Sequence, residues 1–324
     1  MNLRAFGKNL GLQAPEFPKG IIWLNTEPLT LKQLRGKIVL IDFWTYSCVN
    51  CLNVMPHLRR WHKLYAKKGL VVIGVHTPEF AFEKDVLNVE TAVKEFDLTY
   101  PVAIDSESKI WEAYNNHWWP RLVLINKAGQ IAFDHVGEGG YVEIEKEIQK
   151  ALRGVGAKAL PKIERESKSS GGVCFPTTPE IYLGFSRGHF KNSDVEANHC
   201  HNYKRVSDQR DTPSLEGEWT VREGYVESHG GKIHLPFMAG SINLVAQTSD
   251  GEKQRIAVVR DGNALATNEA GDDIVFDGDD SVIFAREPRM YRLLAASAHL
   301  TGVLTLNVPS GVRLYSLTFG SACE

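Results

Sequence analysis

Two different patterns of apolar residues divide the chain. In the first half, residues 37–44 and 70–76 are short apolar runs rich in β-branched and aromatic side chains, as is typical of strands buried in a sheet. Between them, residues 51–68 repeat apolar side chains every three or four positions, which predicts an amphipathic helix that ends at Gly69. This strand–helix–strand order indicates an α/β domain.

The rest of the first half continues the alternation. We expect a helix, a short strand, two strands joined by a tight turn with a glycine, and a last amphipathic helix at residues 88–96, 101–104, 121–126, 130–136 and 141–152. The hairpin adds antiparallel pairing to a sheet whose earlier strands are parallel. We therefore expect an α/β sandwich with mixed strand directions over residues 1–152.

The pattern changes at residue 153. Residues 153–177 are rich in Gly, Lys, Glu and Ser and have no apolar period, which predicts a linker. Residues 178–324 then show about nine short apolar runs separated by turn signals. We expect an all-β sandwich here, and a jelly roll is the arrangement that this spacing favours.

Composition excludes several classes of protein. The 324 residues carry 37 basic and 39 acidic side chains, a balance that gives no electrostatic reason to bind nucleic acid. No apolar run reaches the ~18 residues that a membrane-spanning helix needs, and the first residues lack the apolar stretch of a signal peptide. We therefore expect either a cytoplasmic protein or the soluble part of a longer one.

The strongest chemical signal is a pair of cysteines. Cys48 and Cys51 form a C-x-x-C motif directly after a predicted strand, where the next helix begins. A helix start stabilises an anion, so we expect Cys48 to be the nucleophilic thiolate and Cys51 to resolve the mixed disulfide. The other cysteines are scattered, so no second pair completes a zinc site. The pattern favours redox chemistry with no metal and no cofactor beyond the Cys48–Cys51 disulfide.

Three neighbouring features fit such a site. Asp42 lies in the apolar strand before the cysteines, where desolvation raises the pKa of a carboxyl group and lets it exchange a proton with Cys51. Pro56 lies within the predicted helix, which it either kinks or ends. The Trp119–Pro120 bond precedes a predicted strand. Spacing alone favours a trans bond, whereas a cis bond would expose a backbone edge to an extended peptide.

These positions resemble the active site of the thioredoxin fold. Asp42, Cys48, Cys51, Pro56 and Pro120 match in turn its buried acid, nucleophilic cysteine, resolving cysteine, helix-kinking proline and cis-proline. The sequence resembles more closely the TlpA/ResA-like family and the soluble C-terminal region of DipZ-type thiol-disulfide exchange proteins. That resemblance rests on the segments FWTYSCVNC, GLVVIGVHTPEFAFEKD, YPVAID and TPEIYLGFSRG.

The resemblance implies an extracytoplasmic oxidoreductase that exchanges disulfides with protein substrates and is supplied with electrons by a CcdA-like membrane protein. It implies that Trp119, Pro120 and Tyr46 contact the substrate. Glu79, at the end of a predicted strand, resembles the active-site glutamate of ResA-like reductases. The second half resembles a jelly-roll domain like those of carbohydrate-binding modules, which implies a glycan or protein ligand.

Two alternatives stay open in the first half. Val49-Asn50 stands between the cysteines in place of thioredoxin's Gly-Pro, and this dipeptide tunes the redox potential, so the reducing or oxidising direction is not set. Thr45-x-x-Cys48 fits the T-x-x-C motif of peroxiredoxin-like thiol peroxidases. That family has a proline where this chain has Ile41, so we favour disulfide exchange.

The second half carries no catalytic pattern. Aromatic residues there could stack on a sugar ring, but aromatic side chains of a sandwich usually pack in its core; they are Trp219, Tyr225, Phe237 and Tyr291. A docking or carbohydrate-binding role therefore rests on the fold alone.

The remaining cysteines and histidines allow weaker hypotheses. His199-Cys200-His201, with His189 near it in sequence, could bind a metal, but no second ligand cluster follows and we favour a surface loop. Cys174 and Cys200 could form a structural disulfide, which leaves Cys323 unpaired.

Overall fold

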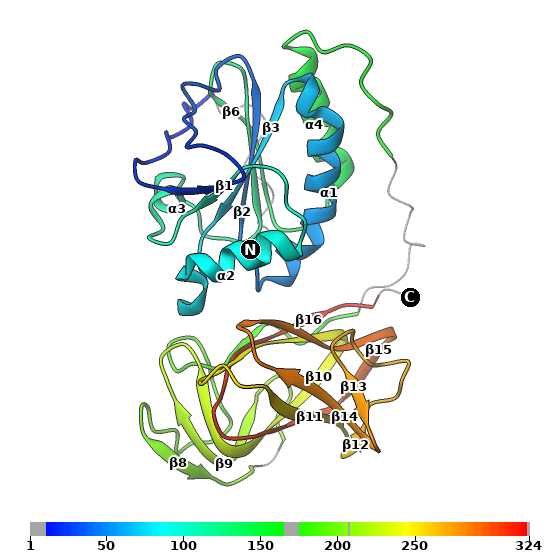
Figure 1. Cartoon of the computed structure of the whole chain (residues 1–324). Helices are drawn as coiled ribbons and strands as arrows, with labels where there is room; N and C mark the ends of the chain where they lie inside the picture. Colours follow the sequence, from blue (N-terminus) through cyan, green and yellow to red (C-terminus); the bar gives the residue numbers. More distant parts are fainter. Residues whose placement is uncertain (1–10, 165–174, 207, 323–324) are drawn as a thin grey trace. The chain divides into compact units, whose positions relative to one another are not determined.

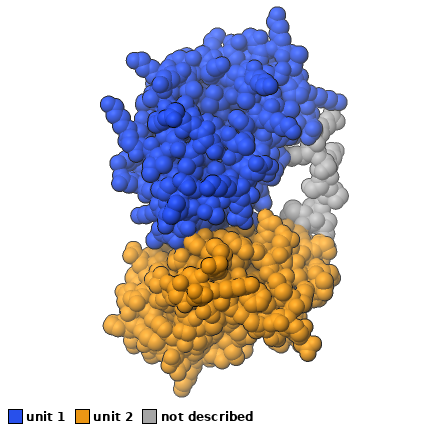
Figure 2. All heavy atoms as spheres, viewed as in Figure 1, with its two compact units in different colours: residues 1–168 blue, residues 169–324 orange. Residues whose placement is uncertain are grey.

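The apolar side chains collect into separate cores in two units, residues 1–168 and 169–324 (Figure 2). The computed structural model describes residues 11–164, 175–206 and 208–322. Within these ranges, the buried residues of each core cluster all come from one unit. Each unit therefore has its own hydrophobic driving force for folding.

Within residues 11–164, the N-terminal unit is built on a six-stranded mixed sheet of order β1-β4-β3-β2-β5-β6 (Figure 1). Strands β2, β3 and β4 are parallel, β1 pairs antiparallel with β4, and β5 and β6 form a hairpin. The strand bounds are β1 Ile22–Leu24, β2 Ile38–Trp44, β3 Leu70–His76, β4 Val102–Ile104, β5 Arg121–Ile125 and β6 Ile131–Val136. This order places β2, which precedes the cysteines, between two partners at the centre of the sheet.

Helices cover both faces of this sheet. Successive strand residues point to opposite faces, so Leu40 packs in the cluster that includes α1, α2 and α4, whereas Ile41 packs in the cluster that includes α3. The helix bounds are α1 Val49–Tyr65, α2 Val86–Glu95, α3 Lys109–Ala113 and α4 Tyr141–Arg153, with 3₁₀ turns η1 Ala66–Lys68 and η2 Ala81–Lys84. Because apolar residues of β2 face both layers, this strand is held rigidly.

Most elements of the first half lie where the sequence predicts them. Helix α1 runs through Pro56 to Tyr65, so the alternative that the helix ends at this proline is wrong. The chain leaves η1 at Gly69, whose φ of 104° requires the left-handed region that glycine tolerates. The short elements β1, α3 and η2 were not predicted. Within the described ranges, no helix is both long and apolar enough to cross a lipid bilayer.

The chain after α4 carries no helix or strand in residues 154–164 and 175–180. The expected linker, residues 153–177, also covers residues 165–174, which lie outside the described residues. Cys174 is among them, so its pairing with Cys200 stays a prediction.

In its described residues, the C-terminal unit is a ten-stranded antiparallel sheet with the path β13-β14-β11-β15-β10-β16-β7. Strands β8 and β9 extend it from β10, and β12 pairs with β11. The strand bounds are β7 Ile181–Tyr182, β8 Cys200–Tyr203, β9 Ser214–Val221, β10 Val226–Thr248, β11 Gln254–Arg260, β12 Asn263–Ala264, β13 Val275–Asp277, β14 Asp280–Ala285, β15 Arg289–Val308 and β16 Val312–Gly320.

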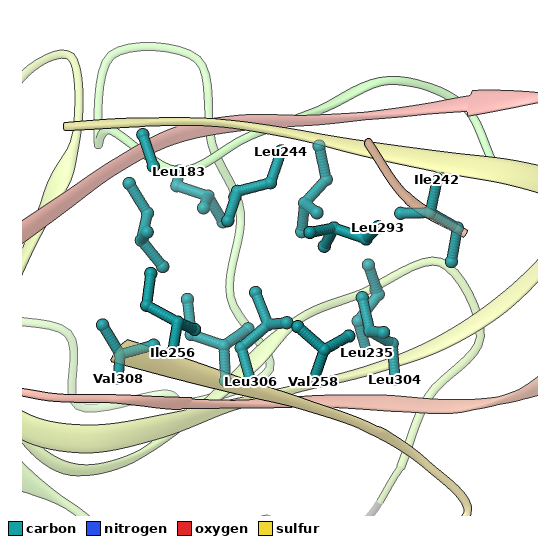
Figure 3. Close-up of a cluster of buried hydrophobic side chains, with 14 of the residues drawn as sticks. Leu183, Leu235, Ile242, Leu244, Ile256, Val258, Leu293, Leu304, Leu306 and Val308 are labelled. Carbon is teal, nitrogen blue, oxygen red and sulfur yellow. The ribbon is translucent and has the colours of Figure 1, made fainter. Parts of the chain in front are cut away.

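Strands β10 and β15 are longer than the sequence predicts. The predicted runs at residues 225–228, 232–237 and 241–248 merge into β10, and those at residues 291–296 and 302–308 merge into β15. They merge because register shifts at Ser228/Gly231 and Ala239/Ser241 bend the chain without ending the ladder. Figure 3 shows the result: Ile242 and Leu244 lie in one layer, and Leu235, earlier in the same strand, lies in the facing layer. The all-β architecture is thus a single bent sheet whose sides enclose one apolar core.

Because the cores are separate, a fragment of residues 1–164 is expected to fold alone. Its circular dichroism should show a single cooperative thermal transition, since the sheet and the helices on both faces are all present. In the full chain, Leu235→Ala should destabilise the C-terminal unit by about 2–5 kcal/mol and leave the transition of the N-terminal unit unchanged. A fragment that melts without cooperativity would contradict the separation of the cores.

Candidate active site

Cys48 is the N-cap residue of α1. Its backbone is extended, with φ −88° and ψ 113°, and its Sγ accepts a hydrogen bond from the Cys51 N–H at 3.4 Å. The i, i+3 spacing brings both cysteines to one side of the first helical turn. Cys48 is half-buried and Cys51 is 1% exposed, and both are free thiols. Of this pair, Cys48 is therefore the cysteine whose sulfur a macromolecular partner can reach.

Burial is the main reason why the pKa of the Cys51 thiol lies well above its ordinary value. The hydrogen bond and charge of Cys48 and the charge of Asp42 raise the pKa further, whereas a hydrogen bond with the Thr45 backbone lowers it. Cys51 therefore keeps its proton at neutral pH until a base removes it.

Asp42 lies in the middle of β2, opposite Gly74 of β3 and Leu122 of β5. Its side chain is 1% exposed, and within the described residues neither carboxylate oxygen has a hydrogen-bond partner. Burial raises the pKa of Asp42 to about 8. The charge effect on Cys51 shows that the carboxyl group and the deeper thiol are close enough to interact.

A second buried titratable group, His76, lies at the end of β3. Its ring is 0% exposed, is stacked on Tyr46 with centroids 5.5 Å apart, and meets Trp44 edge-on at 5.0 Å. Burial lowers the pKa of His76 to about 3, so its imidazole is neutral. Tyr46 itself is only 4% exposed and has little surface to offer a substrate.

The Trp119–Pro120 bond is cis, although spacing alone favours trans. Pro120 directly precedes β5, whose first residue pairs with Phe43 near the end of β2, so the proline and the cysteines lie at the same edge of the sheet. The Trp119 indole N–H donates to the Thr77 carbonyl at 3.1 Å, just past the end of β3. Trp119 is half-buried and also contacts Trp111, with ring centroids 4.2 Å apart and ring planes tilted by 33°, which leaves it partly accessible beside the site.

Glu83 is the functional candidate that sequence reasoning missed. Glu79, the glutamate expected at the strand end, lies in the loop after β3 and is half-buried. Glu83, in η2, is 0% exposed and its carboxylate accepts hydrogen bonds from Ser47, the residue before Cys48. Its place directly after the apolar residues Phe80-Ala81-Phe82 was the one available signal.

In the described part of the chain, no group of three or more His, Cys, Asp and Glu side chains is arranged so that it could hold a metal ion. His201 lies in β8 and contacts carboxylates of Asp194 at 3.3 Å and Glu196 at 3.9 Å, and Cys200 is exposed. Cys174 and Cys323 lie outside the described residues.

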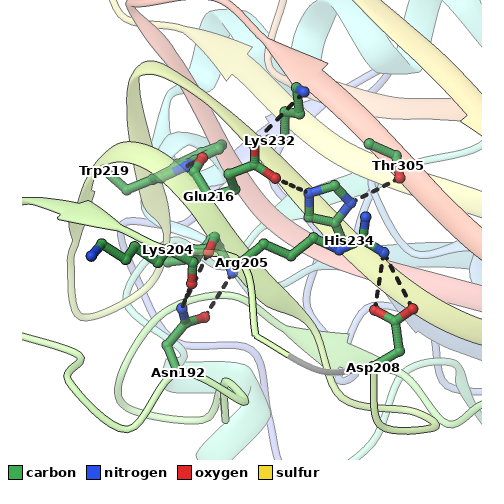
Figure 4. Close-up of polar contacts among 10 residues, drawn as sticks. Asn192, Lys204, Arg205, Asp208, Glu216, Trp219, Lys232, His234 and Thr305 are labelled. Carbon is green, nitrogen blue, oxygen red and sulfur yellow. Dashed lines mark hydrogen bonds and ion pairs between the residues drawn. The ribbon is translucent and has the colours of Figure 1, made fainter. Parts of the chain in front are cut away.

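The C-terminal unit has a cluster of polar contacts on β9, β10 and β15 (Figure 4). His234 is bound on both sides, by Glu216 at 2.9 Å and by Thr305 at 3.0 Å, and Lys232 lies 3.6 Å from Glu216. Two adjoining hollows of about 460 and 500 Å³ share Lys232 and Asn307 in their linings. Of the aromatic residues expected to pack in the core, Trp219, Phe237 and Tyr291 are buried and Tyr225 is half-buried.

Comparisons with known families agree with this division. Residues 9–151 match the family model described as Redoxin, and residues 178–320 match the model described as Thioredoxin like C-terminal domain. The chain is 32% identical to protein DipZ of Mycobacterium tuberculosis over 95% of this chain and 43% of DipZ. The chain thus spans less than half the length of that relative.

Two shorter relatives match the N-terminal unit. The chain is 32% identical to thiol-disulfide oxidoreductase YkuV of Bacillus subtilis, over 43% of this chain and 93% of YkuV. It is also 32% identical to thiol-disulfide oxidoreductase ResA of Bacillus cereus, over 44% of this chain and 78% of ResA. The fold and the paired thiols therefore place the N-terminal unit in the thioredoxin-like class. The chain belongs to the thiol-disulfide oxidoreductase family that includes YkuV and ResA.

Replacing Asp42 with Asn should change the pH dependence of stability. The folded pKa of about 8 lies above the unfolded value of 3.8, so unfolding releases a proton between these values and stability falls as pH rises from about 4 to about 8. Asp42→Asn removes this fall and should stabilise the protein at pH 8 by up to ~5 kcal/mol. Urea unfolding at both ends of the range tests this, with pH 4, where both side chains are neutral in the folded state, as the control. If the wild type and Asp42→Asn change in stability equally between pH 4 and pH 8, the carboxyl group is exposed to solvent and the assignment is wrong.

Proposed function

We propose that this chain exchanges disulfides with protein substrates through Cys48 and Cys51. The observation that carries the proposal is the contrast between the accessible Cys48, at the start of α1, and the buried Cys51 one turn deeper. The Cys48 thiolate attacks a substrate disulfide, forms a mixed disulfide and releases one substrate thiolate. The Cys51 thiolate then attacks Cys48 Sγ, releases the second substrate thiolate and leaves the Cys48–Cys51 disulfide.

Asp42 serves as the base for the second step. Cys51 must lose its proton before it can attack, and its burial opposes that loss. A carboxylate whose pKa is about 8 has an affinity for protons close to that of a thiol, so it can take the proton without being trapped in one form. The reverse reaction returns the proton by the same route and oxidises the substrate.

The proposed substrate-binding position is the edge of the N-terminal sheet beside Pro120. An extended peptide that pairs with the backbone next to the cis-proline would bring its sulfur to Cys48. Trp119 flanks this position and is held by Thr77 and Trp111. Tyr46 packs on His76 in the interior beneath the cysteines and does not itself contact the substrate in this proposal.

The direction of electron flow depends on the reduction potential of the couple. A value near about −270 mV would make the protein a reductase and one near about −120 mV an oxidase. We propose that the protein acts outside the cytoplasm and receives electrons from a CcdA-like membrane protein, in line with its similarity to DipZ. No cofactor is needed beyond the thiol pair.

A peroxiredoxin-like peroxidase is the rival function. It would require Thr45 to act on Cys48, but the Thr45 hydroxyl lies 3.4 Å from His76 Nε2. Turnover of hydrogen peroxide by the reduced protein, in the absence of a disulfide substrate, would favour the rival.

We also propose that the C-terminal unit is a jelly-roll docking module for a glycan or a protein. The adjoining hollows at Lys232 and Asn307 support a polar ligand rather than one stacked on aromatic rings. Binding of residues 175–324 to a glycan array or to envelope proteins tests this, and binding to neither removes the proposal.

Cys51→Ser should trap substrates as mixed disulfides on Cys48, because the second attack is lost. Cys48→Ser should trap little, since Cys51 is buried. Non-reducing electrophoresis with mass spectrometry of the trapped peptides measures both, and the double variant is the control. Preferential trapping by Cys51 would reverse the assigned roles.

Asp42→Asn should slow disulfide exchange by about 10–100-fold near pH 7, the range in which general bases usually contribute. The defect should shrink as pH rises, because hydroxide then ionises Cys51 without help. A pH–rate profile for both proteins on one disulfide substrate measures this effect. Profiles that superimpose would show that Asp42 takes no part in proton transfer.

A further inference from the structure

Hydrogen-bond donors surround the buried carboxylate of Glu83. Its Oε1 accepts from the Ser47 hydroxyl at 2.6 Å and from the Ser47 N–H at 3.4 Å. Its Oε2 accepts from the backbone N–H groups of Glu79 at 2.6 Å and Phe80 at 2.9 Å. Both Glu83 and Ser47 are almost completely buried, at 0% and 2% exposure. A buried carboxylate this well matched is a structural anchor rather than a solvated side chain.

These donors match only the ionised form of Glu83. Burial raises the pKa of Glu83, and the hydrogen bonds from Ser47, Thr45 and Phe80 oppose that rise. An amide at this position has one oxygen. Its NH₂ group must point either toward the N–H groups of residues 79–80 or toward the N–H of Ser47. In both orientations one hydrogen-bond donor faces another donor and no acceptor lies between them.

The contact joins two segments that are distant in sequence. Ser47 ends the turn between β2 and α1, and Glu83 lies in η2 beyond β3. The backbone hydrogen bond within the turn is long, since the distance from the Cys48 nitrogen to the Thr45 oxygen is 3.4 Å. The short Ser47–Glu83 bond is therefore a strong restraint on the residue that precedes Cys48.

We propose that Glu83 is a positioning residue for the disulfide exchange inferred above: its carboxylate fixes the turn at Ser47 and thereby holds Cys48 Sγ at the start of α1. There the unpaired N–H groups and the helix dipole stabilise the thiolate. Glu83 acts through Ser47 and takes no part in bond making. This inference rests on Cys48 being the nucleophile.

Glu83 could also affect Cys48 through its negative charge, and this effect on the Cys48 thiolate would have the opposite sign. Cys51 and Asp42 lie on the core side of the thiol, and Glu79 adds its charge to that of Glu83 on the η2 side. If Glu83 acted only as a negative charge, its removal would favour the Cys48 thiolate. If it acts by position, its removal disfavours the thiolate. The two explanations therefore differ in sign.

The test is the rate of iodoacetamide labelling of Cys48 in the reduced full-length protein, followed by peptide mass from pH 5 to pH 10. The variants are Ser47→Ala, Glu83→Gln and both together. Glu145→Gln is the matched control, because Glu145 is a buried carboxylate that binds Tyr65 at 2.5 Å and Arg60 at 2.7 Å at the other end of α1. Circular dichroism of every variant checks that it is folded.

Ser47→Ala and Glu83→Gln should each slow labelling at pH 7 by about fivefold, the size of one lost capping interaction. Each should move the midpoint to higher pH and leave the rate above the midpoint unchanged, and the double variant should be no slower than either single one. Glu145→Gln should lower thermal stability but keep the wild-type midpoint.

A midpoint that moves to lower pH in Glu83→Gln, or that coincides with the wild type, overturns the proposal, as does an additive effect in the double variant. Insulin-disulfide reduction by the wild type separates this outcome from a failure of the proposed function. If the wild type exchanges disulfides and the midpoints coincide, only the role of Glu83 is wrong.

Discussion

The turn that connects β2 to α1 is the constraint on which the active site depends. β2 is hydrogen-bonded on both sides, by β3 and β5, and every residue of it is buried, so its end cannot shift. α1 is equally fixed by its buried face. Residues 45–47 must span the two, and all of them are buried. The position of Cys48 therefore follows from the packing of a whole layer, and a thiol at a helix start is the result.

The interior around this turn holds titratable groups that are mostly uncharged. Burial raises the pKa of Asp42 to about 8 and lowers that of His76 to about 3, and both shifts favour the neutral form at pH 7. Cys51 is kept protonated by the same cause. Glu83 differs because donors surround it. A negative charge that forms on sulfur during exchange therefore interacts strongly with these neighbouring groups, because little water and few opposite charges screen it.

The central strands and long helices could be predicted because their patterns are local. Apolar runs and helical spacing are visible within a few residues, and the C-x-x-C motif and Asp42 lie within a single segment. Membership of the thiol-disulfide oxidoreductases was confirmed by the relatives. Glu83 could not be recognised in this way, because its partner Ser47 is brought to it by the pairing of β2 with β3. The full lengths of β10 and β15 were not predicted for a related reason: the residues at a β-bulge interrupt the apolar alternation, so one bent strand looks like several short ones.

The long bent strand β10 has a consequence for how the protein is made. Its residues pair with strands that follow much later, as Gly231 does with Val308 and Val226 with Leu314. During synthesis these partners leave the ribosome last. β10 can pair early with β9, but its remaining backbone groups stay unpaired until β15 and β16 are complete. The N-terminal unit contains all the strands of its own sheet before that point. A nascent chain would therefore carry a finished thiol site ahead of an unfinished β unit, and the second unit is where a chaperone would be needed.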